Sequence, residues 1–166
     1  MKIRNKELHR ITSTAIIYRK QKGGIKYLIA QRSFKKKAFP GKWTVPGGGL
    51  ETDDYINTRK TTKDLWYFAI EKSLRREVKE EVNLEVGRIK YLLDIAFIIP
   101  GGTPAIILSF YCPYKSGKVK YDKDTIDHVW VTYKQTKKYD LIDGILEEIE
   151  MVDKILKGGK NINYKH

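Results

Sequence analysis

The order of apolar segments along the chain constrains its fold more than any other feature of the sequence. Segments rich in β-branched and aromatic residues are typical of strands, and the first two are separated by KQKGG, whose glycines predict a hairpin turn. Two longer segments repeat apolar residues every three or four positions, as amphipathic helices do. The predicted strands cover residues 13–19, 25–33, 42–45, 88–99, 105–114 and 128–133, and the predicted helices cover 62–82 and 140–156. This order predicts an α/β fold with a mixed sheet.

The chain has the length and composition of one domain. Of its 166 residues, 41% are hydrophobic and 32% are charged, so it is long enough to bury a core and differs from disordered proteins. No repeat or low-complexity segment divides it, and we expect a single domain over residues 1–166. Cys112 is the only cysteine, which excludes an intrachain disulfide and a zinc site built from several thiolates.

Positive charge exceeds negative charge by a wide margin. The 33 lysines and arginines against 20 aspartates and glutamates give a formal net charge of +13, which favours anionic partners such as nucleotides or nucleic acid. The N-terminal residues carry scattered charges in place of a signal peptide, and Pro100 and Gly101 interrupt the apolar run of residues 92–112. We therefore expect a cytoplasmic protein without a membrane partner. The sequence does not predict the oligomeric state.

Three glutamates, Glu77, Glu80 and Glu81, lie close together in the helical segment RREVKEEVNL. At about 100° per residue they fall within roughly 100° of the helix circumference, beside the apolar stripe that continues through Val78 and Val82. Carboxylates this close repel one another unless positive charge compensates them. Two interpretations follow: a solvated charged face, which is common in helices rich in Glu and Lys, or a site for a hard divalent cation such as Mg²⁺.

The glycine-rich segment that precedes this helix favours the cation site. GKWTVPGGGLE followed by R-E-V-K-E-E-V-N-L resembles the Nudix hydrolase signature, in which a glycine and an acidic residue precede R-E-U-x-E-E-x-G-U, U being a bulky apolar residue. The resemblance extends over about residues 12–156, and the matching positions are Gly48, Arg76, Glu77, Val78, Glu80, Glu81 and Leu84. It implies a Nudix-type α/β/α sandwich with a mixed β-sheet.

The chain departs from the signature at two places. Asp54 occupies the acidic position, but 21 residues separate it from Arg76. This spacing is far longer than in the family and indicates an insertion at about residues 55–68. Asn83 replaces the last glycine of the signature, and Asn is the residue next best suited to a left-handed helix end. The insertion leaves the role of Asp54 open.

The insertion has two interpretations. It extends the helix backward, with Trp66 and Ile70 one turn apart and packed on the sheet, or it supplies cations and aromatic rings to a phosphorylated, base-bearing substrate. Aromatic residues at helical spacing belong more often to a core, so the first interpretation is favoured for Trp66. The candidates for substrate contact are Tyr55, Arg59, Lys60, Lys63 and Tyr67.

The resemblance also implies roles for the residues of the helix. Glu77, Glu80 and Glu81 are the implied ligands of Mg²⁺ or Mn²⁺, and such an ion neutralises phosphate charge and lowers the pKa of an attacking water. Arg76 lies four residues before Glu80, so the two side chains are expected to form an ion pair along the helix.

Residues outside the helix complete the candidate site. Gly47, Gly48 and Gly49 have no side chains, so their amides can approach a phosphate closely. Arg32 ends a strand that points toward this loop and is a candidate phosphate or base contact, although a surface arginine is an equal alternative. A general base is expected from the loop before residue 128, which holds Asp122, Asp124 and Asp127. Asp124 and Asp127 are the candidates nearest the strand, and a merely polar loop is the alternative.

The implied activity is Mg²⁺-dependent hydrolysis of the pyrophosphate bond in a nucleoside diphosphate linked to another group X, as in a nucleoside triphosphate or ADP-ribose. An RNA 5′-end pyrophosphohydrolase or decapping activity is an alternative that the net charge allows. A non-catalytic nucleotide or RNA sensor is a second alternative, which the intact glutamates disfavour. The sequence does not identify the base, the sugar or X.

Overall fold

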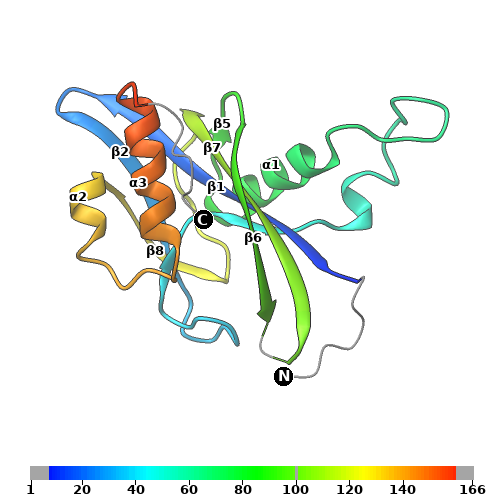
Figure 1. Cartoon of the computed structure of the whole chain (residues 1–166), viewed down its shortest axis with the longest axis horizontal. Helices are drawn as coiled ribbons and strands as arrows, with labels where there is room; N and C mark the ends of the chain where they lie inside the picture. Colours follow the sequence, from blue (N-terminus) through cyan, green and yellow to red (C-terminus); the bar gives the residue numbers. More distant parts are fainter. Residues whose placement is uncertain (1–7, 100, 160–166) are drawn as a thin grey trace.

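The computed structural model describes residues 8–99 and 101–159, and a mixed β-sheet lies at its centre (Figure 1). The strands are β1 (Arg10–Gln21), β2 (Gly24–Arg32), β3 (Trp43–Thr44), β4 (Gly47–Gly49), β5 (Glu85–Val86), β6 (Lys90–Ile99), β7 (Thr103–Ser116) and β8 (Thr125–Val131). The helices are the 3₁₀ helix η1 (Thr52–Asp54), α1 (Ala69–Val82), α2 (Tyr133–Thr136) and α3 (Ile145–Leu156). No helix within the described ranges is both long and apolar enough to cross a membrane.

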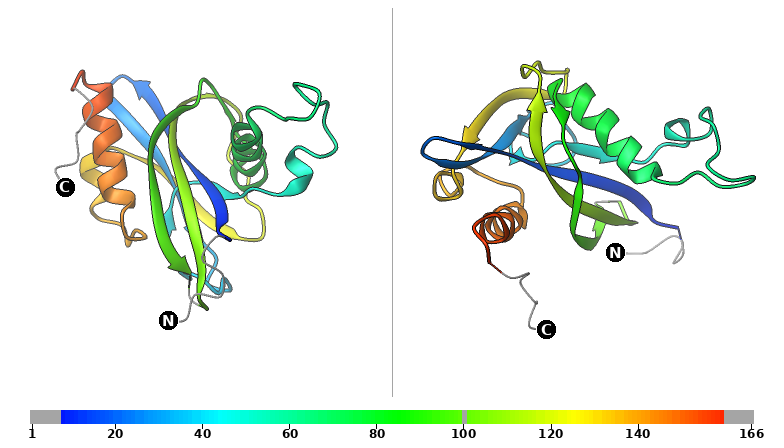
Figure 2. Two further views of the ribbon diagram at one scale, coloured as in Figure 1. Left: turned by 45° about the vertical axis from the view of Figure 1, so that its right-hand side comes forward. Right: turned by 90° about the horizontal axis from the view of Figure 1, so that it is seen from above.

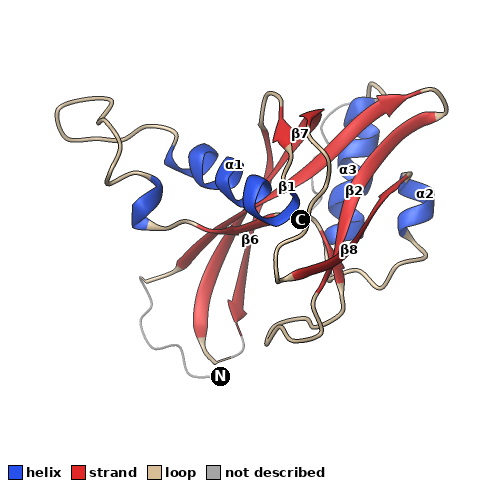
Figure 3. Ribbon diagram, turned by 180° about the vertical axis from the view of Figure 1, so that it is seen from behind, coloured by secondary structure: helices blue, strands red, loops and turns tan. Residues whose placement is uncertain are grey.

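Parallel and antiparallel pairs both occur in the sheet. β1 runs parallel to β7, whereas it pairs antiparallel with β2 along one part of its length and with β4 along another. β7 also pairs antiparallel with β6. On the other side, β2 pairs antiparallel with β3 and with β8, and Figure 3 shows β8 beside β2. The short strand β4 therefore lies beside β1 where β2 has diverged from it.

The two long helices cover opposite faces of the sheet. Seen from above, α1 and α3 lie on either side of it (Figure 2). Alternation along β1 explains how both helices are packed, because successive side chains of a strand point to opposite faces. Ile17 packs in the core with Val78 of α1, and Ile16 packs in a second core with Ile149 of α3. The predicted α/β/α sandwich with a mixed sheet is confirmed.

Several local predictions are confirmed. The KQKGG turn joins β1 and β2 as a hairpin, with Gly23 and Gly24 at positive φ. Asn83 ends α1 in the left-handed conformation, at φ 53°. The long predicted strands 88–99 and 105–114 correspond to β6 and β7. The last predicted strand ends early, because the hydroxyl of Thr132 accepts a hydrogen bond from the Gln135 amide and so caps the four-residue helix α2.

Both helices begin later than predicted. The prediction of a helix from residue 62 is wrong, because the Thr61 and Thr62 hydroxyls accept hydrogen bonds from the amides of Tyr67 and Leu65 and so stabilise turns. Phe68 has φ 59°, which a right-handed helix cannot contain, so α1 starts at Ala69.

The closing helix starts at Ile145 instead of residue 140. The segment before it bonds to the strand β3: Trp43 donates its amide to the carbonyl of Asp140, and Ile142 donates its amide to the carbonyl of Trp43. Residues 140–142 therefore pair with Trp43 in a strand-like bridge, although their apolar spacing resembles that of a helix.

Residues 55–68 form an excursion that projects away from the sheet (Figure 1). The favoured interpretation of Trp66, packing on the sheet, is wrong. Its ring contacts Tyr55 at 5.5 Å between centroids, Lys60 lies over it, and its indole N–H donates to the carbonyl of Thr58. The excursion is held together by its own contacts, and Phe68 at its end is 73% exposed. It has the form of a surface loop and not of a helical extension.

Candidate functional site

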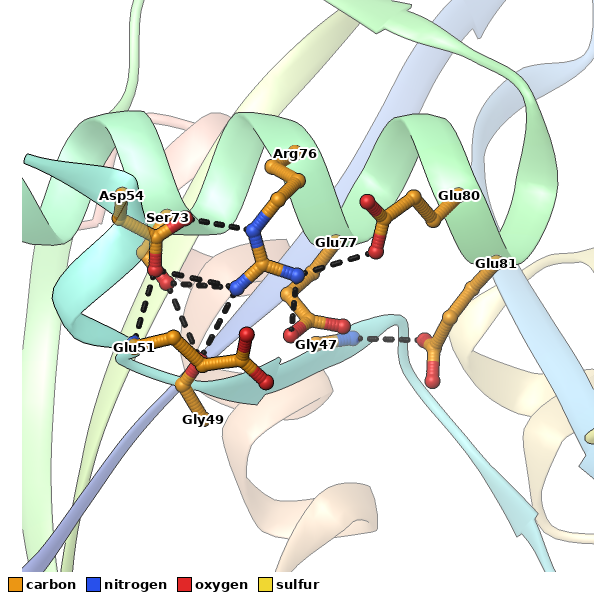
Figure 4. Close-up of polar contacts among 9 residues, drawn as sticks. All are labelled: Gly47, Gly49, Glu51, Asp54, Ser73, Arg76, Glu77, Glu80 and Glu81. Carbon is orange, nitrogen blue, oxygen red and sulfur yellow. Dashed lines mark hydrogen bonds and ion pairs between the residues drawn. The ribbon is translucent and has the colours of Figure 1, made fainter. Parts of the chain in front are cut away.

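Arg76 organises the polar cluster on α1 (Figure 4). Its Nη1 donates to Oε1 of Glu77 at 2.9 Å and to Oε2 of Glu80 at 3.0 Å, which confirms the predicted ion pair along the helix. Its Nη2 donates to Oδ2 of Asp54 at 3.0 Å and to the carbonyl of Gly49 at 3.1 Å. One guanidinium thus connects α1 to the 3₁₀ helix and to the glycine strand.

Asp54 is the residue whose role the sequence left open. Its side chain is only 2% exposed. The hydrogen bonds from Arg76 are the main reason that its pKa is lowered to about 2. Asp54 therefore stays ionised and fixes Arg76 across the whole length of the excursion. Its place at the acidic position of the signature is the sequence feature that pointed to it.

Glu81 lies at the other end of the cluster, against β4. The amide of Gly47 donates to its Oε2 at 2.9 Å. Burial is the largest cause that raises its pKa to about 7, and the negative charges of Glu77 and Asp122 raise it further. A cation bound here would relieve both the burial cost and the repulsion.

The glycines of β4 make room for these carboxylates. A Cβ atom on Gly48 would lie 2.2 Å from Cδ of Glu77, and one on Gly47 would lie 2.2 Å from the carbonyl oxygen of Ser13. Any side chain at either position would displace the carboxylate or the neighbouring strand. Gly47, Gly48 and Gly49 were predicted to contact phosphate, and the amide of Gly47 is directed at Glu81 instead.

The donor set suits a hard divalent ion. Within residues 8–99 and 101–159, no three His, Cys, Asp or Glu side chains are grouped as they would be around one ion. Glu80 is 57% exposed and engaged by Arg76, whereas Glu77 and Glu81 approach the glycine strand together. Mg²⁺ is usually held by one or two carboxylates, with waters and substrate phosphates completing its shell. Two partly buried carboxylates that repel each other fit that chemistry.

A cavity of about 10 Å³ adjoins Glu81, and two predicted site residues, Arg32 and Asp124, line it with Glu81. The Nε of Arg32 donates to the carbonyl of Ala38 at 3.1 Å. Oδ2 of Asp124 pairs with Nζ of Lys36 at 2.7 Å, and this hydrogen bond lowers the pKa of Asp124.

The other aspartates of this region differ in position. Asp127 lies on β8, is exposed, and is not among the cavity residues. Asp122 accepts hydrogen bonds from the amides of Asp124 and Thr125, both at 2.9 Å, and its charge acts on Glu81. The sequence placed Asp122 in the acidic loop without favouring it, because an Asp in a Lys/Asp-rich loop resembles any turn residue.

A larger groove of about 740 Å³ lies on the opposite face of the sheet. Its walls are residues 91–96 of β6 and Gly144, Glu147 and Glu148 at the start of α3. Most of this lining is apolar. Glu148 is only 4% exposed, whereas Glu147 beside it is exposed to solvent. The sequence did not single out this groove or either glutamate.

Comparison with known proteins supports the same description. The NUDIX domain family model matches residues 8–149. The nucleoside triphosphatase NudI of Klebsiella pneumoniae is 26% identical over 126 residues, covering 69% of this chain and 79% of that protein.

Two solved structures share the fold. The NUDIX domain of Shewanella oneidensis NrtR, crystallised with ADP ribose, has a TM-score of 0.71 and 16% identity, covering 90% of each chain. The MutT protein of Methanosarcina mazei Go1 has a TM-score of 0.67 and 21% identity, covering 92% of this chain and 99% of its own.

Proposed function

The chain belongs to the NUDIX hydrolase family, and we propose that it hydrolyses the pyrophosphate bond of a nucleoside diphosphate linked to a further group, using Mg²⁺ or Mn²⁺. The observation that carries this proposal is the cluster around Arg76. One guanidinium positions Glu77 and Glu80, while the partly buried Glu81 is held one turn beyond Glu77 by the Gly47 amide. Such an arrangement of carboxylates lacks the positive charge that a divalent ion would bring.

The metal would be held by Glu77 and Glu81, with Glu80 at the exposed side of the cluster. A bound divalent ion would neutralise charge on the phosphate oxygens and lower the pKa of the attacking water. Pyrophosphate hydrolysis needs mainly charge neutralisation and positioning, and the carboxylates contribute to both. Arg76 is a positioning residue, because its guanidinium bonds to three carboxylates and a backbone carbonyl.

The chain's own cations and amides would orient the substrate. Arg32 lines the cavity beside Glu81, so its guanidinium is the nearest candidate for a phosphate oxygen. Asp124 lines the same cavity and would hold the attacking water or accept its proton, with Lys36 fixing its carboxylate. Asp127 was an equal candidate from sequence, and its exposed position on β8 makes it the weaker one.

The substrate class rests on relatives. One relative is a nucleoside triphosphatase, and a solved NUDIX domain of the same fold binds ADP ribose. Both ligands contain a nucleoside and a pyrophosphate bond. We therefore expect a nucleoside triphosphate or an ADP-ribose-like molecule as substrate.

An RNA 5′ end is a second candidate, and one loop favours it. Residues 33–42 border the cavity beside Glu81, since Arg32 bonds to Ala38 and Lys36 pairs with Asp124. In this loop Phe34 is 71% exposed and Phe39 is 41% exposed, with exposed lysines between them. Cations interleaved with aromatic rings suit single-stranded nucleic acid.

A substrate screen tests the proposal. The wild-type protein, Glu81→Gln and the exposed control Glu85→Gln would be incubated with nucleoside triphosphates, ADP-ribose, dinucleoside polyphosphates and 5′-triphosphorylated RNA, with Mg²⁺ or with EDTA. We expect release of phosphate, pyrophosphate or mononucleotide by the wild type and by Glu85→Gln with Mg²⁺ only. Turnover that survives EDTA, or that Glu81→Gln retains in full, would overturn the proposal. Strongly salt-dependent RNA binding without turnover would favour a sensor.

A further inference from the structure

The excursion of residues 55–68 displays two aromatic rings to solvent. Tyr55 and Trp66 contact each other within it, at 5.5 Å between ring centroids. Tyr67 and Phe68 lie outside this pair and meet edge to face, with their centroids 6.4 Å apart. These two residues are 47% and 73% exposed. The excursion therefore holds both rings in place and leaves them accessible.

The backbone at Phe68 is strained, although the residue packs on no core. Its φ of 59° lies in the left-handed region, where a bulky residue is an outlier. Strain of this kind is common at binding and catalytic sites. Hydrogen bonds on either side maintain the conformation: the Tyr67 amide donates to the hydroxyl of Thr61, and the Lys72 amide donates to the carbonyl of Phe68. The local structure thus fixes an exposed ring without burying it.

Positive charge accompanies these rings. Arg59, Lys60 and Lys63 are exposed, and Asp64 is the one acidic residue in the sequence of positions 55–68. Within the part of the chain that the structure describes, no carboxylate forms an ion pair with any of these three cations. The excursion therefore combines accessible aromatic rings with positive charge that the protein's own carboxylates do not neutralise.

The excursion lies at a distance from the carboxylates of the Arg76 cluster. The helix α1 starts at Ala69, and Glu77 follows eight positions later, roughly 12 Å along the helix axis. Figure 2 shows the excursion continuing past the start of α1 and away from the sheet. A ligand with its phosphates at Glu77 reaches the exposed rings only if it extends over more than this distance, as a strand of several nucleotides does.

A nucleic-acid partner accounts for both features of this surface. Bases stack on aromatic rings, phosphates pair with cations, and a single strand leaves the faces of its bases free. A protein partner would account for the rings and for the exposed Ile56 and Leu65, but protein interfaces are depleted in lysine. The formal net charge of +13 also favours an anionic partner.

We propose that the excursion is a binding site for a single-stranded polynucleotide, RNA or DNA. Tyr67 and Phe68 stack on bases, and the cations Arg59, Lys60 and Lys63 contact phosphates. The proposal goes beyond the proposed function and does not depend on it, because a strand with a 5′-hydroxyl contains no pyrophosphate bond. On a strand that ends in a 5′-triphosphate, the excursion would hold nucleotides that follow the reacting end.

Fluorescence anisotropy with labelled oligonucleotides tests the binding. Single strands of RNA and of DNA with a 5′-hydroxyl, each about 12 nucleotides long, would be compared with a duplex of the same length and sequence. We expect the wild type to bind one or both single strands about 10-fold more tightly than the duplex, because a duplex hides the faces of its bases. The tighter of the two strands identifies the ligand as RNA or DNA. A duplex that binds as tightly as both single strands, or no binding to either strand, would overturn the proposal.

Leucine variants test the stacking. The double variant Tyr67→Leu and Phe68→Leu keeps an apolar surface but removes both aromatic rings, so it should bind the preferred strand about 10-fold more weakly or worse. The control Leu65→Ala changes an exposed apolar residue of the same excursion that has no ring, and it should bind like the wild type. Wild-type affinity in the folded double variant would exclude stacking on these rings. Circular dichroism verifies folding, and the comparison of strand and duplex needs no variant.

The dependence of binding on salt tests the cations. Replacing Arg59, Lys60 and Lys63 together by glutamine should reduce the slope of log K against log salt by about 2, since each phosphate contact on a single strand contributes about 0.7. The matched control replaces three exposed lysines on and after α2, which lies at the opposite end of the molecule (Figure 1). These are Lys134, Lys137 and Lys138. This control has the same net charge and should keep the wild-type slope, and equal slopes in the two triple variants would contradict the site.

Kinetics separates the excursion from the proposed function. Nucleoside triphosphates held at the carboxylates do not reach the rings, so the leucine double variant should keep the wild-type kcat/KM on them. If the wild type hydrolyses nucleotides but binds no strand, the excursion site fails and the hydrolase stands. If strands bind as expected and nothing is hydrolysed, the proposed function fails and the excursion site stands. If no strand binds, and sedimentation velocity shows self-association that Leu65→Asp abolishes, the surface is a protein interface and the proposal is overturned.

Discussion

The partly buried Glu81 and the buried Glu148 lie on opposite faces of the same sheet, and their surroundings differ. Glu81 on the α1 face accepts a hydrogen bond from the Gly47 amide, and Glu148 on the α3 face accepts one from the Ser109 hydroxyl. Burial is the largest cause that raises the pKa of each. The charges of Glu77, Asp122 and Arg32 act on Glu81, whereas the groove beside Glu148 is lined mainly by apolar residues of β6.

Burial alone therefore does not define what a carboxylate binds. Around Glu81, the negative charges of Glu77 and Asp122 add to the burial cost, so a cation is the partner that stabilises the site. Among the residues that the structure describes, the exposed Glu147 is the one carboxylate whose charge raises the pKa of Glu148, so a neutral donor suffices. A site that depends on charge and a site that depends on hydrogen bonds should respond differently when glutamate is replaced by glutamine.

Replacing each glutamate by glutamine should have unequal effects on turnover. Glu81→Gln removes the negative charge of a metal ligand. Because metal assistance lowers the activation barrier by several kcal/mol, we expect kcat to fall about 10³-fold. Glu148→Gln should leave kcat within about 3-fold, since α3 packs on the face of the sheet opposite Glu77 and Glu81. Steady-state kinetics at saturating Mg²⁺ measures both, with circular dichroism to verify folding. Equal losses in the two variants would remove the distinction between the faces.

The free energy of unfolding in EDTA should depend on pH through Glu81. The folded pKa is about 7 against an ordinary value of 4.5, so the folded state holds a proton that the unfolded state has lost between these values. The contribution of Glu81 to the free energy of unfolding is therefore at its maximum below pH 4.5. It falls by up to about 3 kcal/mol as the pH rises toward 7.

Glu81→Gln cannot titrate, so it should be more stable than the metal-free wild type at pH 8 by up to about 3 kcal/mol, and the difference should vanish near pH 4. Urea titrations at several pH values measure this. A difference that is the same at pH 4 and pH 8 would contradict the assigned pKa. Saturating Mg²⁺ should reduce the advantage of the variant, because an ion that binds the folded wild type stabilises it.

The acidic loop offers a comparison within the α1 face. Asp124 lines the cavity beside Glu81 and Asp127 does not, so Asp124→Asn should lower kcat about 10²-fold and Asp127→Asn less than about 3-fold. The pH profile of kcat distinguishes a lost base from lost structure, because only the first flattens the acidic limb. If both variants keep the wild-type profile, the base lies on α1 or is not needed.

Replacing residues 55–65 by a short connector should have the smallest effect. The hydrogen bonds of the excursion lie within it or reach η1 and the start of α1, so the fold should survive. Its aromatic rings and cations would contact only some substrates, so we expect KM to change unevenly, by up to about 10-fold, as for loss of one stacking contact. Equal changes on every substrate, or an unfolded spectrum, would assign the segment a structural role.

The sequence predicted the Arg76 cluster better than the groove, for a physical reason. The spacing of Glu77, Glu80 and Arg76 is local to one helix, so helical geometry alone brings their side chains together. Glu148 lies beside Glu147 in a helix rich in glutamate and looks solvated in sequence. Only the packing of α3 on β7, which joins residues 39 positions apart, buries one of the two.

The structure of the excursion was also not predictable from its sequence pattern alone. Its helical spacing was real, but the hydrogen bonds that the hydroxyls of Thr61 and Thr62 accept from nearby amides competed with helix formation. The left-handed Phe68 then separated it from α1. Asp54 reaches Arg76 across this excursion, and no local pattern encodes a contact over that distance.

Binding of Mn²⁺ tests most directly the claim that the α1 face takes a cation and the α3 face does not. Electron paramagnetic resonance of free Mn²⁺ would be titrated against wild type, Glu81→Gln and Glu148→Gln at pH 8. The wild type and Glu148→Gln should bind Mn²⁺ alike, and Glu81→Gln should bind it about 10-fold more weakly or worse, as loss of one charged ligand implies. Unchanged Mn²⁺ binding by Glu81→Gln, or weakened binding by Glu148→Gln alone, would contradict the account.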